Sequence, residues 1–247
     1  MIPRFRGLTN SLPLQVAMTI VGVWVISLWS CFQLQLETMH PIGLFWLMGW
    51  QTWIYTGLFI TAHDAMHGSI HPSPWLNRAI GQLCVGLYAG FDYSLLASKH
   101  HLHHQYPASD RDPDFHDGNT PNFWGWYAHF VCEHFSWRQA INLLLMFGTY
   151  TLVCQFDLAT PLLLRIPNLL LFWVIPSLLS SLQLFYFGTF LPHREPDGGY
   201  LNPHRAQTIS RSRWWSLMSC YHFGYHQEHH ESPHIPWWQL DRSRSIN

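Results

Sequence analysis

Long hydrophobic blocks alternate with polar segments along the 247-residue chain. Four blocks carry few or no charged residues. As helices that rise about 1.5 Å per residue, they can span most or all of a hydrocarbon core of about 30 Å. The pattern predicts an all-α integral membrane protein with four transmembrane helices in two hairpins, approximately at residues 12–36, 42–62, 139–156 and 162–191.

A fifth apolar stretch, residues 77–98, is interrupted by Arg78, Gln82, Asp92 and several glycines. It predicts an interfacial helix or a shallow re-entrant segment. A full crossing is the alternative, but it would place the histidines that precede and follow the stretch on opposite sides of the membrane. We therefore favour four spans, with both termini on the side that carries the histidines.

The remaining segments are polar. Residues 105–137 are rich in proline and aromatic residues and contain an acidic run, which predicts an ordered soluble loop. The run comprises Asp110, Asp112, Asp114 and Asp117. Residues from 192 onward predict a soluble tail, with Trp237 and Trp238 as an interfacial anchor. The chain shows no internal repeat, so residues 1–247 are interpreted as one domain.

Composition supports the membrane interpretation, because 48% of the residues are hydrophobic and only 11% are charged. A formal net charge of -1 without a basic run excludes a nucleic-acid-binding surface. All Lys and Arg residues except Arg165 fall on the predicted histidine side. By the positive-inside rule that side is cytoplasmic. The five cysteines are scattered without metal-binding or disulfide spacing and are interpreted as packing residues.

Three histidine clusters stand next to the apolar blocks. Residues three or four apart on a helix share one face, so each cluster presents a fan of imidazoles in one direction. The fans are His63 and His67; His100, His103 and His104; and His226, His229 and His230. One closed zinc site takes about four ligands, so eight converging imidazoles fit two metal ions with open positions for chemistry. His101 lies about 100° from this face and is not expected to be a ligand. A register set by His101 and His104 is the alternative.

The motifs HDAMH, HHLHH and YHQEHH resemble the histidine boxes of the membrane fatty acid desaturase and hydroxylase superfamily. More narrowly, FITAHDAMHG, FGTFLPHR and CYHFGYHQEHH resemble segments of the β-carotene ketolases. This resemblance implies two iron ions with O2 as co-substrate, and oxidation of C4 of a β-ionone ring to a ketone by two hydroxylations and loss of water. It implies that the substrate is β-carotene, taken from the lipid bilayer, and that the products are echinenone and then canthaxanthin. It also implies a ferredoxin-type electron donor.

The resemblance also suggests further site residues. His193 and His222 stand where related proteins carry extra ligands, and each is either a ligand or a histidine in a supporting position. Asp64 and Glu228 lie inside the boxes and are expected to accept hydrogen bonds that fix imidazole tautomers. The other histidines are interpreted as ordinary loop residues: His40, His71, His116, His129, His134, His204 and His234.

Three alternatives stay open at this point. A related lipid oxygenase, such as a carotenoid 3-hydroxylase or a fatty acyl desaturase or hydroxylase, would use the same boxes. A zinc intramembrane protease is disfavoured because HDAMH has Asp in place of the Glu of HExxH and because two further boxes are present. A haem protein is disfavoured because the predicted spans contain no histidine.

Overall fold

The computed structural model describes residues 11–118, 120–153, 166–209 and 212–243, and within these ranges the regular structure is helical, without strands. The longer helices are α1 (Leu12–Phe32), α2 (Pro41–Met66), α3 (Pro74–Ala89), α4 (Tyr93–Gln105), α5 (Phe123–His134), α6 (Trp137–Val153) and α8 (Ile175–Phe185). The shorter α-helices are α7 (Ile166–Leu169), α9 (Leu191–His193), α10 (Arg213–Cys220), α11 (His226–Glu231) and α12 (Leu240–Ser243). Short 3-10 turns lie at Leu36–Thr38 and Trp237–Gln239.

Two of the described helices are long and apolar enough to cross a membrane. They are α1 and the continuous helix Ile166–His193, which runs from α7 to α9. The second contains two π-helical turns, Leu170–Val174 and Tyr186–Phe190. Two of the four predicted spans therefore have matching helices. Residues 157–161, which connect the predicted third and fourth spans, lie outside the described residues.

The other two predicted spans, 42–62 and 139–156, are not matched by a candidate membrane helix among the described residues. Helix α2 has 26 residues, but its Trp, Tyr, Thr and Gln side chains make it less apolar than α1. Helix α6 has 17 residues, and the last three residues of the predicted span 139–156 lie outside the described part of the chain. The four-helix arrangement therefore remains a prediction.

The structure corrects two expectations. Residues 77–98 are not one helix, because α3 ends at Gly90, which has a left-handed φ of 68°, and α4 begins after Asp92. The Asp92 carboxylate accepts a hydrogen bond from the Leu95 amide at 2.9 Å and caps α4. The predicted loop 105–137 contains the 12-residue helix α5, capped in the same way by Asn122.

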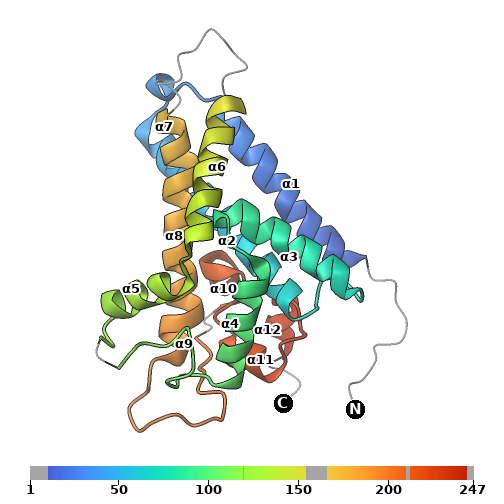
Figure 1. The fold of residues 1–247 in the computed structure, drawn as a ribbon, viewed down its shortest axis with the longest axis vertical. Coiled ribbons are helices and arrows are strands. Elements are labelled where there is room, and N and C mark those ends of the chain that lie inside the picture. Colours follow the sequence, from blue (N-terminus) through green and yellow to red (C-terminus); the bar gives the residue numbers. More distant parts are fainter. Residues whose placement is uncertain (1–10, 119, 154–165, 210–211, 244–247) are drawn as a thin grey trace.

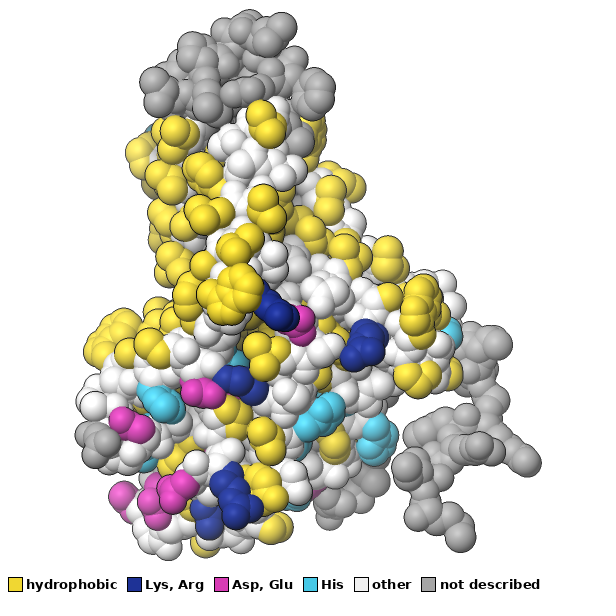
Figure 2. Space-filling view, in the orientation of Figure 1, with side chains coloured by type: hydrophobic (Ala, Val, Ile, Leu, Met, Phe, Trp, Pro, Cys, Tyr) yellow, Lys and Arg dark blue, Asp and Glu magenta, His cyan; other side chains and the backbone are white. Residues whose placement is uncertain are grey.

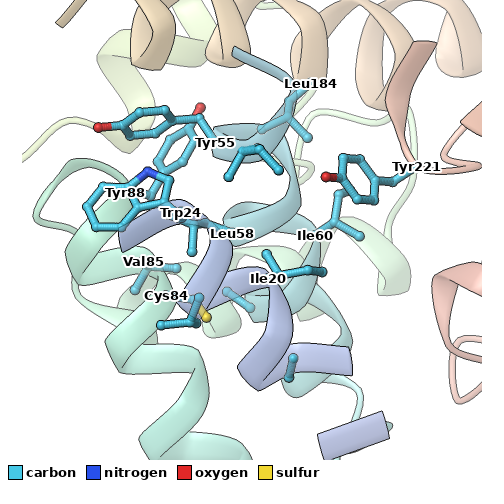
Figure 3. Close-up of a cluster of buried hydrophobic side chains, with 14 of the residues drawn as sticks. Ile20, Trp24, Tyr55, Leu58, Ile60, Cys84, Val85, Tyr88, Leu184 and Tyr221 are labelled. Atoms are coloured by element: carbon cyan, nitrogen blue, oxygen red, sulfur yellow. The ribbon is translucent and has the colours of Figure 1, made fainter. Parts of the chain in front are cut away.

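The apolar core packs α1, α3 and α8 around α2, which lies in the middle of the fold (Figure 3). Tyr55 of α2 contacts Trp24 of α1 edge to face, with ring centroids 5.4 Å apart, and Tyr88 of α3 at 6.1 Å. Thr56 hydrogen-bonds Ser180 of α8 at 2.8 Å. Helix α2 is thereby fixed against three neighbours along the length that leads to His63.

Polar and apolar surfaces are separated along the molecule. Helices α6, α7 and α8 extend away from the end that holds α4, α9 and α11 (Figure 1). On the face shown in Figure 2, hydrophobic side chains cover the extended arm, whereas charged side chains and histidines gather at the opposite end. The histidine fans lie at this polar end.

Candidate metal centre

Each histidine fan stands on or at the end of a helix, as its spacing predicts. His63 lies in the last turn of α2, and His67 caps the C-terminus of that helix. The second fan lies on α4 and the third on α11. Helix α2 continues past Ala62 and carries the first fan beyond the predicted span.

The fans converge into two groups of imidazoles whose ligand atoms lie within 4.8 Å of one another in each group. The first histidine group comprises His63, His67, His100, His104 and His229. The second histidine group comprises His103, His193, His226 and His230. The fans on α4 and α11 are thus each divided between the two groups.

The nitrogen geometry fits a cation at the centre of each group. The Nε2 atoms of His63 and His229 are 3.1 Å apart in the first group, and those of His193 and His226 are 2.9 Å apart in the second. All six close Nε2 pairs fall between 2.8 and 3.2 Å. Nitrogens bound to one ion at about 2.1 Å, along directions 90° apart, would lie about 3 Å from each other. A single proton can be shared by only one such pair of Nε2 atoms, whereas a cation at the centre can bind all the Nε2 atoms that converge on it.

Burial keeps the imidazoles of both groups, except that of His103, in the neutral form that binds metals. It lowers the pKa of His104 to about 2, and it holds the pKa values of His226 and His229 well below the usual value. Neighbouring imidazoles lower the three pKa values further, because each disfavours a second positive charge nearby. The site therefore offers lone pairs at neutral pH.

Tyr221 fixes the C-terminal segment against α2 and so brings the third fan to the first. Its ring stacks on Trp53 with centroids 4.5 Å apart. A Cβ at Gly57 would lie 2.6 Å from the Tyr221 hydroxyl oxygen, so the absence of a side chain at Gly57 allows this approach. Tyr221 and His222 both have left-handed φ angles, 46° and 63°, and they reverse the chain between α10 and α11. His226, four residues later, then points into the second group.

The two histidines suggested by resemblance have different positions. His193, at the end of the long apolar helix, belongs to the second group, and its Nδ1 donates a hydrogen bond to the Arg205 carbonyl at 2.9 Å. His222 is buried but lies in neither group, and its ring is 6.3 Å from that of Trp237. His101 is exposed and also lies in neither group.

Neither carboxylate inside the boxes makes the expected hydrogen bond to an imidazole among the described contacts. Asp64 accepts a hydrogen bond from the Trp237 amide at 3.1 Å, and its carboxylate is 3.7 Å from His63 Nδ1. Glu228 accepts a hydrogen bond from the Thr208 hydroxyl. Both residues tie the C-terminal part of the chain together around the site.

Asp112 makes the contact that the sequence analysis assigned to those carboxylates. Both of its oxygens lie 3.0 Å from His103 Nδ1, and this bond directs His103 Nε2 toward the second group. Burial alone would lower the pKa of His103, but the carboxylates of Asp112 and Asp114 outweigh it and raise that pKa. The sequence showed Asp112 only as one member of an acidic run, without a signal that separated it from its neighbours.

An apolar cavity reaches both groups. This inner cavity is lined by His63, His100, His103 and His226 and by apolar residues that include Phe59, Leu96, Leu184 and Phe223. An outer groove follows between α5, α6 and α8, lined by residues that include Phe135, Leu143, Phe147 and Trp173. The two spaces share Tyr88, Phe91, Phe130, His134 and Ser181 and therefore adjoin.

A helical fold over the described residues, with two candidate membrane helices and two histidine groups that could each hold a metal ion, is typical of the class of histidine-box membrane proteins. The model of the family described as fatty acid desaturase matches residues 37–246. The chain belongs to this family, whose members are membrane-bound.

Relatives of higher identity within this similarity are named as carotenoid ketolases. A "Beta-carotene ketolase" from Paracoccus sp. (strain PC1) is 42% identical over 83% of this chain and 81% of the relative. "Beta-carotene 4-ketolase 3" from Haematococcus lacustris is 37% identical over 94% of this chain and 78% of the relative. A "Zeaxanthin 4-ketolase" from Chlamydomonas reinhardtii is 38% identical over 94% of this chain and 53% of the relative. No solved structure matches the chain.

Proposed function

We propose that this protein is a β-carotene 4-ketolase, an oxidoreductase that converts C4 of a β-ionone ring to a ketone. The observation that carries the proposal is the position of both histidine groups on the wall of one apolar cavity. The ketolase relatives at 37–42% identity support the same activity. The products are echinenone, with one oxidised ring, and canthaxanthin, with two.

The nine grouped histidines are the proposed ligands of two iron ions, one for each group. His222 is left out of this set because it lies in neither group. When bound, the irons would supply the activation of O2 that removal of a hydrogen from the allylic C4 requires, since no side chain can take that hydrogen as a proton at neutral pH. Asp112 and the Arg205 carbonyl hold His103 and His193 in the orientation that binding needs.

The cavity and groove determine which molecule reaches the site. A carotenoid has no charge, so its binding energy comes from burial of apolar surface. Phe59, Leu96 and Phe223 surround the ring position in the inner cavity, and the groove beside α6 accepts the polyene chain. The aromatic walls also exclude water from the reacting carbon. Substrate taken from the bilayer fits the groove, because its outer lining is apolar.

The membrane arrangement and the electron supply are also proposals. Four spans with both termini and the metal centre on the cytoplasmic side are supported by the separation of apolar and charged surfaces (Figure 2) and by the distribution of Lys and Arg.

Each hydroxylation consumes one O2, two electrons and two protons and releases one water. A ferredoxin-type donor on the cytoplasmic side supplies the electrons.

Residues 1–247 form one domain in this proposal. Cysteine labelling near Met39 tests the topology, since that residue should react only from outside the cell.

Expression in a bacterium that makes β-carotene tests the activity. We expect echinenone and canthaxanthin in the pigment extract and none in cells that express His104→Ala, which lacks one ligand of the first group. Pigments hydroxylated only at C3, or desaturated lipids without a keto carotenoid, would contradict the proposal and favour a related lipid oxygenase.

A further inference from the structure

A polar pocket lies between the start of α6 and the segment that joins α3 to α4. It has a volume of about 230 Å³, and its lining includes Gln82, Asp92, Arg138, Gln139 and Asn142. One water molecule takes up about 30 Å³ in the liquid, so the pocket has room for a larger polar group. Its residues belong to neither histidine group, so the pocket is separate from the metal centre.

An apolar groove continues from this pocket along α3 and α6. This α3–α6 groove has a volume of about 460 Å³, and its apolar lining includes Leu83, Leu87, Leu145 and Met146. The pocket and the groove adjoin, because they share Gln82, Gly90, Phe91 and Asn142. Leu144 and Phe147 of α6 instead line the outer groove. The two grooves therefore lie on different faces of α6.

Gln139 places an unsatisfied acceptor at the pocket. Its side-chain NH2 group donates a hydrogen bond to the Ala89 carbonyl at 3.0 Å. Its Oε1 is buried and has no hydrogen-bond partner in the described part of the chain. The residue is only 5% exposed. Because a buried acceptor without a partner is costly, Oε1 favours a ligand that brings a hydrogen-bond donor.

Two opposite charges stand at the edge of the same pocket. Arg138 and Asp92 both line it, and both residues are exposed. The Arg138 guanidinium lies 5.5 Å from the centre of the Trp137 ring. The Asp92 carboxylate uses Oδ1 to cap α4 and keeps its negative charge beside the pocket. A zwitterionic ligand with a hydrogen-bond donor matches all three groups.

The pocket lies where the apolar and charged surfaces of the molecule meet. On the face shown in Figure 2, charged side chains begin where the apolar arm of α6, α7 and α8 ends, and α6 starts at this end of the arm (Figure 1). Trp137 of the pocket lining is 69% exposed, and tryptophan is enriched at membrane–water interfaces. Since members of the family are membrane-bound, lipid headgroups are the zwitterions available at this level.

We propose that the polar pocket and the α3–α6 groove bind a phospholipid with an ethanolamine headgroup. Arg138 binds the phosphate, the ammonium group donates a hydrogen bond to Gln139 Oε1 and pairs with Asp92, and one acyl chain lies along the groove. A choline headgroup has the same charges but no N–H to donate, and a glycerol headgroup has donors but no positive charge. The inference goes beyond the proposed function and does not depend on ketone formation.

Native mass spectrometry of the protein, purified in detergent and freed of lipid, tests the site. Phospholipids with identical acyl chains and ethanolamine, choline or glycerol headgroups are titrated one at a time. We expect the ethanolamine lipid to bind about tenfold more tightly than the choline lipid, because one hydrogen bond from a charged group contributes about that factor. The glycerol lipid should also bind more weakly than the ethanolamine lipid, because it offers Asp92 no opposite charge.

Headgroup variants separate the roles of the three polar residues. Gln139→Met removes the acceptor and should remove most of the preference for ethanolamine over choline. Asp92→Asn keeps an oxygen that can cap α4 but lacks the charge, and it should reduce that preference by about twofold to fivefold. Arg138→Gln should weaken both lipids equally, because both carry the phosphate. Arg78→Gln, an exposed arginine of α3 outside both linings, is the control and should bind like wild type.

A further variant tests the acyl-chain groove. Gly86 lines the groove, and a Cβ there would meet only Gln82 Nε2, at 3.8 Å, so Gly86→Leu fills the space without a clash at Cβ. It should weaken all three lipids, whereas Gly148→Leu in α6, outside the groove lining, should not. Wild-type affinities for the ethanolamine and choline lipids within about twofold of each other would overturn the inference. An unchanged preference in both Gln139→Met and Asp92→Asn, or full binding in Gly86→Leu, would overturn it as well.

Discussion

His104 and His230 stack on each other with ring centroids 4.2 Å apart and ring planes 23° from parallel. His104 belongs to the first histidine group and His230 to the second, so this contact joins the two groups. A ring that shifts in one group therefore displaces a member of the other. The two proposed ions are expected to bind interdependently.

Iron content should distinguish His193 from His222. His193→Ala removes one of the four imidazoles of the second group and should lower iron below two ions per chain, whereas His222→Ala removes none and should retain both. Plasma mass spectrometry of the purified variants provides the measurement. Retention of iron in His193→Ala with loss in His222→Ala would show that the ligand assignment is wrong.

The second fan allows a comparison of adjacent residues. His100 lies in the first group, and His101 is exposed outside both groups. His100→Ala should nearly abolish ketone formation and lower the iron content, while His101→Ala should keep both near wild type. The opposite pattern would mean that the fan is set by His101 and His104.

Asp112 should control metal affinity through its contact with His103, although it belongs to neither of the two histidine groups. Asp112→Asn weakens the hydrogen bond that orients His103, and loss of such a partner typically costs about tenfold to a hundredfold in metal affinity. Competition with a chelator measures the change. Asp110→Asn, an exposed member of the same acidic run, is the matched control and should bind iron like wild type.

Gly188 should tolerate no side chain, because a Cβ there would lie 2.6 Å from the Phe223 ring. Both residues line the inner cavity. Gly188→Ala forces that ring to move. The substitution should lower the free energy of unfolding by about 1–3 kcal/mol, as overpacking usually does. It should also lower the rate of ketone formation. Gly148→Ala in α6 is the control, since nothing lies within 4 Å of its added Cβ. Thermal melting in detergent compares the two, and an equal Tm would refute the packing argument.

The sequence predicted those parts of the site that depend on local periodicity. Histidines three and four apart identify a helix face, and α4 and α11 present such faces. The division of each fan between two groups depends on how α2, α4 and α11 meet, which spacing along one helix does not encode. His193 joins the second group only because the long apolar helix ends beside α11, far away in the sequence.

The remaining differences arise from loops. Asp112 reaches His103 through the fold of a segment whose composition predicted only a polar loop, and that loop also contains α5. Gly90 ends α3 because it adopts a left-handed conformation, although the apolar pattern continues past it. His134, interpreted from the sequence as an ordinary loop histidine, lines the inner cavity because α5 packs beside α8.

A single-turnover experiment tests the central claim most directly. The purified protein, loaded with iron and reduced without oxygen, is mixed with β-carotene in nanodiscs and then given a pulse of O2. We predict no change in the pigment before the pulse and oxidation at C4 of the ring after it, detected by mass spectrometry and chromatography. Oxidation without O2, reaction only at C3, or equal activity of protein containing zinc in place of iron would contradict the account.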